Sequence, residues 1–180
     1  MRVIAGKYKG RTLFPPKGDR VRPTTDRIKE NVFNLIQGKV AGAAFLDLFG
    51  GSGAMSIEAL SRGAARTVTV DAAEDSIALI KKNFQKMGVG AEGQVVKQSY
   101  DVALKSLTNT PFDVIYLDPP YLAEFVTDVL DKIVVFNVLA KDGVVVYEHA
   151  TATDFCYEGG LERIDSRKYG SVTIEIFKRP

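Results

Sequence analysis

Ala44-Phe45-Leu46-Asp47-Leu48-Phe49-Gly50-Gly51-Ser52-Gly53 is the stretch that decides the fold. An apolar strand over 44–49 runs directly into a glycine-rich turn, and a helix is expected over 54–62. Glycines at such a turn let the backbone bend sharply and let a ligand approach it closely. The stretch therefore predicts the first strand–turn–helix unit of an α/β sheet, with a ligand site at the carboxyl end of the strand.

Strand and helix patterns alternate through the rest of the chain. Further strands are expected over 67–71, 94–98, 113–117 and 144–148, and further helices over 26–37, 74–87, 102–107 and 124–135. Continuous apolar strands joined by helices are typical of a parallel sheet covered on both faces. The two longer alternating strands at the end, 161–167 and 172–178, predict an antiparallel hairpin added to this sheet.

Composition limits the classes of protein. The 180 residues, 46% of them hydrophobic, suffice for one domain with a full core and a small appendage. No segment approaches the roughly 18 apolar residues of a membrane span, and the basic N-terminus lacks the apolar region of a signal peptide. Cys156 and His149 are the only residues of their types, which argues against disulfides and against a metal site. A cytoplasmic protein without metal is expected.

Charge is unevenly distributed. Residues 1–22 carry a net charge of +6, whereas the remainder carries −4. A basic N-terminal segment on a slightly acidic body is typical of a protein that binds phosphate groups, although a merely solvated segment has the same pattern. Tyr8 lies among these cations and favours nucleic acid, because aromatic rings stack on unpaired bases. We expect residues 1–23 to form a basic hairpin and loop that contact RNA, and residues 24–180 to form the catalytic domain.

The glycine-rich turn and the strand that follows it predict a cofactor site. Asp71 ends the next strand, where a carboxylate accepts hydrogen bonds from ribose hydroxyls. Asp47 would repel a pyrophosphate but attract a cation, which favours S-adenosylmethionine over NAD. The expected cofactor-binding residues are Asp47, Phe49, Gly51, Ser52, Gly53 and Asp71, together with Ser99 and Tyr100 near the adenine.

The segment Asp118-Pro119-Pro120-Tyr121 predicts the reaction centre. It follows an apolar strand, and its prolines end that strand because they donate no ladder hydrogen bonds. The Asp118 carboxylate and a proline carbonyl can accept both N–H bonds of an exocyclic amine, and the Tyr121 ring can stack on the base. The tetrapeptide resembles the motif of methyltransferases that act on adenine N6, cytosine N4 or guanine N2.

Five segments together resemble the RsmD family of bacterial 16S rRNA guanine-N2 methyltransferases. They are RVIAGKYKGR at 2–11, RPTTDR at 22–27, DLFGGSG at 47–53, DPPY at 118–121 and KYG at 168–170. The resemblance implies a Rossmann-like class I methyltransferase sheet of seven strands with the last one antiparallel. It also implies S-adenosylmethionine as donor and 16S rRNA within a small-subunit particle as substrate. Ser99 stands where the family usually has aspartate.

Under this interpretation, phosphates of the RNA contact a set of basic residues: Arg2, Lys7, Lys9, Arg11, Arg22 and Lys168. Two other classes stay open. One is a different amino-methyltransferase, acting on DNA adenine N6 or protein glutamine N5, and Asp118 in place of asparagine counts against the glutamine enzyme. The other is an RNA-binding assembly protein without catalysis, against which the intact Asp118, Tyr121 and glycine-rich turn argue. An NAD-dependent oxidoreductase is disfavoured by Asp47 and by the glycine spacing.

Overall fold

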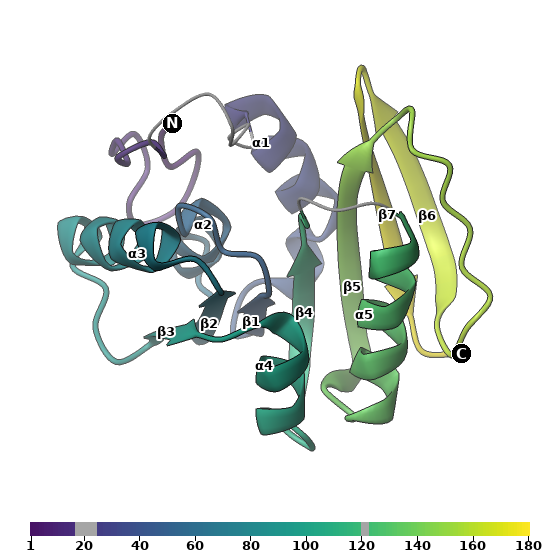
Figure 1. The fold of residues 1–180 in the computed structure, drawn as a ribbon. Helices are drawn as coiled ribbons and strands as arrows, with labels where there is room; N and C mark the ends of the chain where they lie inside the picture. The colour runs from purple at the N-terminus through teal and green to yellow at the C-terminus, as the bar shows by residue number, and fades with distance from the viewer. Residues whose placement is uncertain (17–24, 120–122) are drawn as a thin grey trace.

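The computed structural model describes residues 1–16, 25–119 and 123–180. The strands are β1 (Ala44–Asp47), β2 (Arg66–Asp71), β3 (Gly93–Lys97), β4 (Phe112–Leu117), β5 (Leu139–Ala150), β6 (Glu162–Tyr169) and β7 (Val172–Lys178). They form one sheet in the order β3-β2-β1-β4-β5-β7-β6 (Figure 1). The strands from β1 to β5 pair in parallel, and β7 lies antiparallel between β5 and β6. The fold class predicted from the sequence is confirmed.

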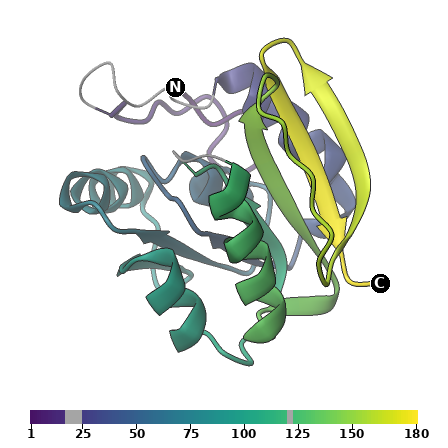
Figure 2. The same ribbon diagram turned by 45° about the vertical axis from the view of Figure 1, so that its right-hand side comes forward.

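Helices cover both faces of the sheet. They are α1 (Asp26–Leu35), α2 (Ala54–Ser61), α3 (Glu74–Met87), α4 (Tyr100–Ser106) and α5 (Ala123–Val135). One face packs against α4 and α5, and the opposite face packs against α1 and α2 (Figure 2). Burial on both faces explains why the central strands read as unbroken apolar runs. Among the described residues, no helix combines the length and the apolar character needed to cross a membrane.

The observed elements match the expected ones, with one clear difference in length. β5 begins at Leu139, whereas the sequence predicted a strand from 144. The segment Lys141-Asp142-Gly143 is typical of a turn, but here it continues the strand, because the pairing between β4 and β5 shifts register near Phe112. The irregular pairing accommodates polar residues that interrupt the apolar pattern.

The N-terminal segment, residues 1–14, forms a looped structure whose ends are joined by a single antiparallel bridge between Arg2 and Thr12. A longer hairpin ladder does not form, because α2 takes up the backbone amides. Ile4 and Ala5 donate to the Glu58 carboxylate at 2.8 and 3.0 Å, and the Tyr8 amide donates to the Ser61 hydroxyl.

The ring of Tyr8 is only 8% exposed and packs in a core cluster with α2 and α3. The expectation that it stacks on bases is wrong, because its apolar surface is used inside the protein. Gly6 explains how closely the segment docks. Its φ is +80°, and a Cβ there would lie 1.6 Å from the Ser61 carbonyl oxygen. The N-terminal segment is therefore packed against the domain and shares its core.

Glu58 is the centre of a buried ionic cluster that joins α1, α2 and the N-terminal segment. Its carboxylate lies 3.3 Å from the Lys29 ammonium and 2.7 Å from Arg62 Nε. Lys29 and Glu58 are both fully buried, and Lys29 also donates to the Arg2 carbonyl. Desolvation lowers the pKa of Lys29, and the Glu58 charge opposes this shift.

We expect Glu58→Gln to lower the free energy of unfolding by about 3–5 kcal/mol, because the buried Lys29 ammonium loses its counter-charge. Glu162→Gln is the matched control, since Glu162 pairs with Lys178 at 3.6 Å on the surface and should cost less than about 1 kcal/mol. Urea denaturation measures both variants. Equal losses of unfolding free energy in the two variants would show that the buried ionic cluster contributes no more to stability than an exposed ion pair.

Candidate active site

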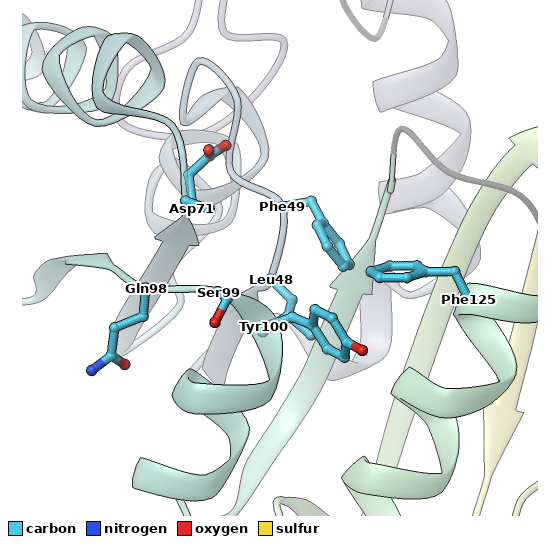
Figure 3. Close-up of a pocket in the computed structure, with 8 residues that line it drawn as sticks. Leu48, Phe49, Asp71, Gln98, Ser99, Tyr100 and Phe125 are labelled. Atoms are coloured by element: carbon cyan, nitrogen blue, oxygen red, sulfur yellow. The ribbon is translucent and has the colours of Figure 1, made fainter.

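A pocket of about 400 Å³ opens at the carboxyl ends of β1, β2 and β3 (Figure 3). It is lined by Leu48, Phe49, Asp71, Ala72, Gln98, Ser99, Tyr100 and Phe125. The lining residues come from the loops that follow these three strands and from the beginnings of α4 and α5. In open parallel sheets, ligands bind at this end of the strands.

Three aromatic rings form one wall of the pocket. Figure 3 shows Phe49, Tyr100 and Phe125 converging, with ring centroids 5.8 Å apart for Phe49 and Phe125 and 4.6 Å apart for Tyr100 and Phe125. The Tyr100 hydroxyl donates to Asp128 at 2.5 Å, and the Lys132 ammonium lies 2.6 Å from the same oxygen. The hydrogen bond to Asp128 raises the pKa of the Tyr100 phenol. This anchoring fixes an apolar wall of mutually tilted rings, against which a planar ring system can pack.

Asp71 connects the pocket to the glycine-rich turn. One carboxylate oxygen accepts the Gly51 amide at 2.9 Å, and the other accepts the Ala73 amide at 2.8 Å. A carboxylate accepts about four hydrogen bonds, so each Asp71 oxygen has a lone pair left for a hydroxyl of a ligand. Asp71 thus shapes the turn and presents acceptors to the pocket.

Asp47 is buried beneath the turn. Its Oδ2 accepts the Ser56 hydroxyl at 3.1 Å, and Thr69 donates to that hydroxyl at 2.6 Å. Its buried Oδ1 has no hydrogen-bond partner among the described residues. Burial raises the pKa of Asp47 to about 7, with the Ser56 hydrogen bond opposing the shift and the Asp71 charge adding to it. An unpartnered carboxylate oxygen suits a ligand that carries a positive charge.

The other turn residues that we expected to bind cofactor shape the loop. Gly53 has a φ of +77° and is the N-cap residue directly before α2, and a Cβ there would lie 3.2 Å from Ile80 and Phe84. The Ser52 carbonyl accepts a hydrogen bond from Asn83. Within the described parts of the chain, the pocket lining does not include Asp47, Gly51, Ser52 or Gly53.

The predicted reaction centre follows β4. Asp118 and Pro119 are half-buried directly after the strand, whereas Pro120 and Tyr121 lie outside the described residues. Asp47 and Tyr116 are paired between β1 and β4, so Asp118 and the pocket residue Phe49 each follow two residues later on neighbouring strands. Below the corner, Tyr116 donates to the buried Glu148 at 2.5 Å. Burial raises the pKa of Tyr116 well above its ordinary value, and the charge of Glu148 adds to the shift.

The predicted RNA-binding residues have different surroundings. Arg2 pairs with Asp26 at 3.1 Å, and Lys7 lies 3.7 Å from Glu92. Arg11 donates to the carbonyl oxygens of Lys86 and Met87 at the end of α3. Lys9 and Lys168 are exposed, and Arg22 lies outside the described residues. Lys168 precedes the turn between β6 and β7, at the end of the sheet where β5 finishes.

Several residues near the site were missed by the sequence analysis, among them Leu48 and Ala72 of the pocket lining. Phe125 and Gln98 line the pocket, and Asn83 is a fully buried amide whose Nδ2 donates to the Ser52 carbonyl at 2.9 Å. Phe125 lies seven residues beyond Asp118, in the first turn of the next helix, which is a signal that could have been used. Asn83 reads as an ordinary helix residue. Across residues 1–16, 25–119 and 123–180, no group of three or more His, Cys, Asp or Glu side chains could hold a metal ion.

The strand order with an antiparallel β7, together with a pocket at the carboxyl ends of β1 to β3, defines the class as a methyltransferase of the Rossmann-like fold. A putative methyltransferase from Escherichia coli, yhhF, has this fold, with a TM-score of 0.87 and 27% identity over 99% of this chain and 97% of its own.

The family described as "Conserved hypothetical protein 95" matches residues 1–178. A putative rRNA methyltransferase, YlbH of Bacillus subtilis, is 36% identical over 99% of both chains. Ribosomal RNA small subunit methyltransferase D of Escherichia coli is 30% identical over 99% of this chain and 90% of its own. The chain belongs to this family, which confirms the resemblance to the RsmD family.

We expect Asp71→Ala to weaken binding of S-adenosylmethionine and of its demethylated product by about 1.5–3 kcal/mol, because charge-assisted hydrogen bonds to the ribose are lost. Calorimetry measures both ligands. Asn83→Ala is the matched control, because it releases the other tether of the turn without removing a pocket acceptor. Equal losses of affinity in the two variants would show that the effect comes from a disturbed turn. Binding of NADH without binding of S-adenosylmethionine would overturn the cofactor assignment.

We expect the affinity for S-adenosylmethionine to rise with pH up to about 7 and then level off. Below that pH, Asp47 is protonated and a cationic ligand must displace its proton, which costs up to tenfold in affinity per pH unit. Asp47→Asn should bind more weakly above pH 7 and should lose this dependence. Asp113→Asn, on the same sheet, should keep it. A wild-type profile in Asp47→Asn would exclude Asp47 as the group that titrates.

Proposed function

We propose that the protein transfers a methyl group from S-adenosylmethionine to the exocyclic N2 of a guanine in small-subunit (16S) ribosomal RNA. The coarser part of this function follows from the family, whose named relatives are rRNA methyltransferases. S-adenosylmethionine is the donor that this family uses. The single observation that carries the proposal is the position of Asp118, which follows β4 two residues after Tyr116, just as the pocket residue Phe49 follows β1 two residues after Asp47, the strand partner of Tyr116.

The residues of the pocket suit the proposed donor. The wall of Phe49, Tyr100 and Phe125 can pack on the adenine ring, and Asp71 has acceptor capacity for the ribose hydroxyls. Asp47, buried beneath the turn next to the pocket residues Leu48 and Phe49, supplies a negative charge toward the cationic end of the molecule when its carboxyl is ionised. When bound, S-adenosylmethionine supplies an electrophilic methyl group on a sulfonium.

The corner after β4 orients the accepting nitrogen. The lone pair of an exocyclic amine is delocalised into the base, so the nitrogen is a weak nucleophile. The Asp118 carboxylate and the Pro119 carbonyl would accept hydrogen bonds from the two N–H groups of the amine. These bonds would draw the nitrogen toward tetrahedral geometry and point its lone pair at the methyl carbon. Transfer of the methyl group to this nitrogen would leave the electron pair of the C–S bond on sulfur, and the nitrogen would pass its surplus proton to the Asp118 carboxylate. Most of the acceleration comes from this positioning.

The basic N-terminal segment supports RNA as the substrate over a protein glutamine. The net charge of +6 in residues 1–22 suits a polyanion, and Lys7, Lys9 and Arg11 are exposed on the N-terminal segment. We infer that this segment, Arg22 and Lys168 contact the RNA within a small-subunit particle in the cytoplasm. Tritiated-methyl transfer to small-subunit particles, followed by nucleoside analysis, tests the function. Label in N6-methyladenine or in protein would overturn it.

We expect Asp118→Ala to lower the transfer rate roughly 100-fold or more, because the target amine loses its positioning acceptor, while affinity for S-adenosylmethionine falls far less. Asp118→Asn keeps one acceptor oxygen, so its transfer rate should lie between those of the wild type and Asp118→Ala. Single-turnover transfer and calorimetry measure rate and affinity separately. A wild-type rate in Asp118→Ala would reduce the corner to a structural feature.

A further inference from the structure

Two lysines of α3 stand over one aromatic ring of the N-terminal segment. The ammonium groups of Lys82 and Lys86 lie 4.0 and 4.3 Å from the centroid of the Phe14 ring. Arg11 adds a third cation beside them, and its guanidinium donates a hydrogen bond to the Lys86 carbonyl at 2.5 Å. The three basic residues are exposed. We call Arg11, Phe14, Lys82 and Lys86 the Phe14 surface.

Among the described residues, the three cations of the Phe14 surface have no acidic partner. Within residues 1–16, 25–119 and 123–180, no carboxylate lies in ion-pair range of Arg11, Lys82 or Lys86, whereas Arg2 and Lys7 each have one. Lys82 and Lys86 share one ring, so their charges lie closer together than the Debye length of about 10 Å at 0.1 M salt. They repel each other, and a bound anion would relieve this repulsion.

The Phe14 surface is held in place by hydrogen bonds. Buried Asn83 accepts the Phe14 amide at 2.8 Å and donates to the Phe14 carbonyl at 3.1 Å. The Lys86 ammonium donates to the Thr12 hydroxyl at 3.2 Å. Arg11 uses two of its five N–H donors on carbonyls of α3, so three are left for a ligand. A preorganised cluster loses less conformational entropy when it binds.

The same asparagine connects this surface to the cofactor side of the protein. The Nδ2 of Asn83 also donates to the Ser52 carbonyl in the glycine-rich turn at 2.9 Å. In Figure 1 the N-terminal segment lies beside α3, at the end of the sheet toward which β4 points. A polyanion on the Phe14 surface would therefore lie at the end of the sheet where Asp118 and the pocket are found.

We propose that Arg11, Lys82 and Lys86 bind the phosphate backbone of the RNA substrate, so that the RNA-binding surface continues from the N-terminal segment onto α3. A polyanion is the ligand, because the cations extend from the Phe14 surface to the exposed Lys7 and Lys9 along the same segment. The proposal rests on the proposed function, since it takes the RNA to be the methylation substrate.

The test is a Lys82→Gln/Lys86→Gln double variant, with Arg11 left intact because it also binds the end of α3. Lys105→Gln/Lys141→Gln is the matched control, since it removes the same charge from exposed lysines on α4 and β5. Binding to small ribosomal subunits and to RNA extracted from them is measured over a range of salt. The first variant should bind on the order of tenfold more weakly at 0.1 M salt, and each lost contact should flatten the slope of log affinity against log salt by roughly 0.7–0.9.

The control should bind as the wild type does, and Lys82→Arg/Lys86→Arg should restore binding because the charge is retained. Affinity for S-adenosylmethionine should be unchanged in all three variants. If wild type methylates RNA and the Gln variant matches the control in affinity and salt slope, the proposal for α3 fails while the proposed function stands. If wild type neither binds nor methylates RNA, both fail.

Discussion

The glycine-rich turn after β1 is held from two sides, and the rest of the site depends on this constraint. Asp71 accepts the Gly51 amide on the β2 side, and Asn83 of α3 donates to the Ser52 carbonyl on the other. Both side chains act through the backbone, so the path of the turn is set by groups outside it. The glycine-rich turn then positions the start of α2, the helix on which the N-terminal segment docks. The same turn covers Asp47.

The pocket and the predicted reaction centre are brought together by strand order. β1 lies between β2 and β4, so the loops that carry Phe49, Asp71 and Asp118 leave neighbouring strands at one end of the sheet. The helices that follow β3 and β4 add the aromatic wall, with Tyr100 on α4 and Phe125 on α5. An aromatic wall and carboxylate acceptors on separate elements suit a donor that combines a base, a ribose and a cation.

Cations of the N-terminal segment serve two purposes. Arg2 and Arg11 fasten the segment to Asp26 and to the end of α3, while Lys9 remains exposed. Glu58 and Ser61 of α2 bind the backbone of the segment from beneath. The segment is thus an anchored part of the domain, and Arg2 and Arg11 are held in place by their contacts with the domain.

The sequence by itself determined the fold class, the order of the elements, the position of the glycine-rich turn and the acidic residues at strand ends. These features depend on local periodicity and on residues adjacent in the chain, which a sequence displays directly. β5 was underestimated because its polar segment 141–143 falls in the register shift between Leu139 and Val144, the residues that pair with β4 on either side of it. Tyr8 was misread because its burial depends on α2 and α3.

Only the tertiary structure decided which side chains meet. Asn83 bonds to Phe14 across 69 residues of sequence, and Tyr100 bonds to Asp128 across 28. No local sequence pattern predicts either of these two hydrogen bonds, because the packing of α3 and α5 decides which distant residues come within reach. The contacts of Phe125, Lys82 and Lys86 follow in the same way from the packing of helices against loops. Local sequence specifies elements and their ends, whereas the geometry between elements comes from burial of their apolar faces.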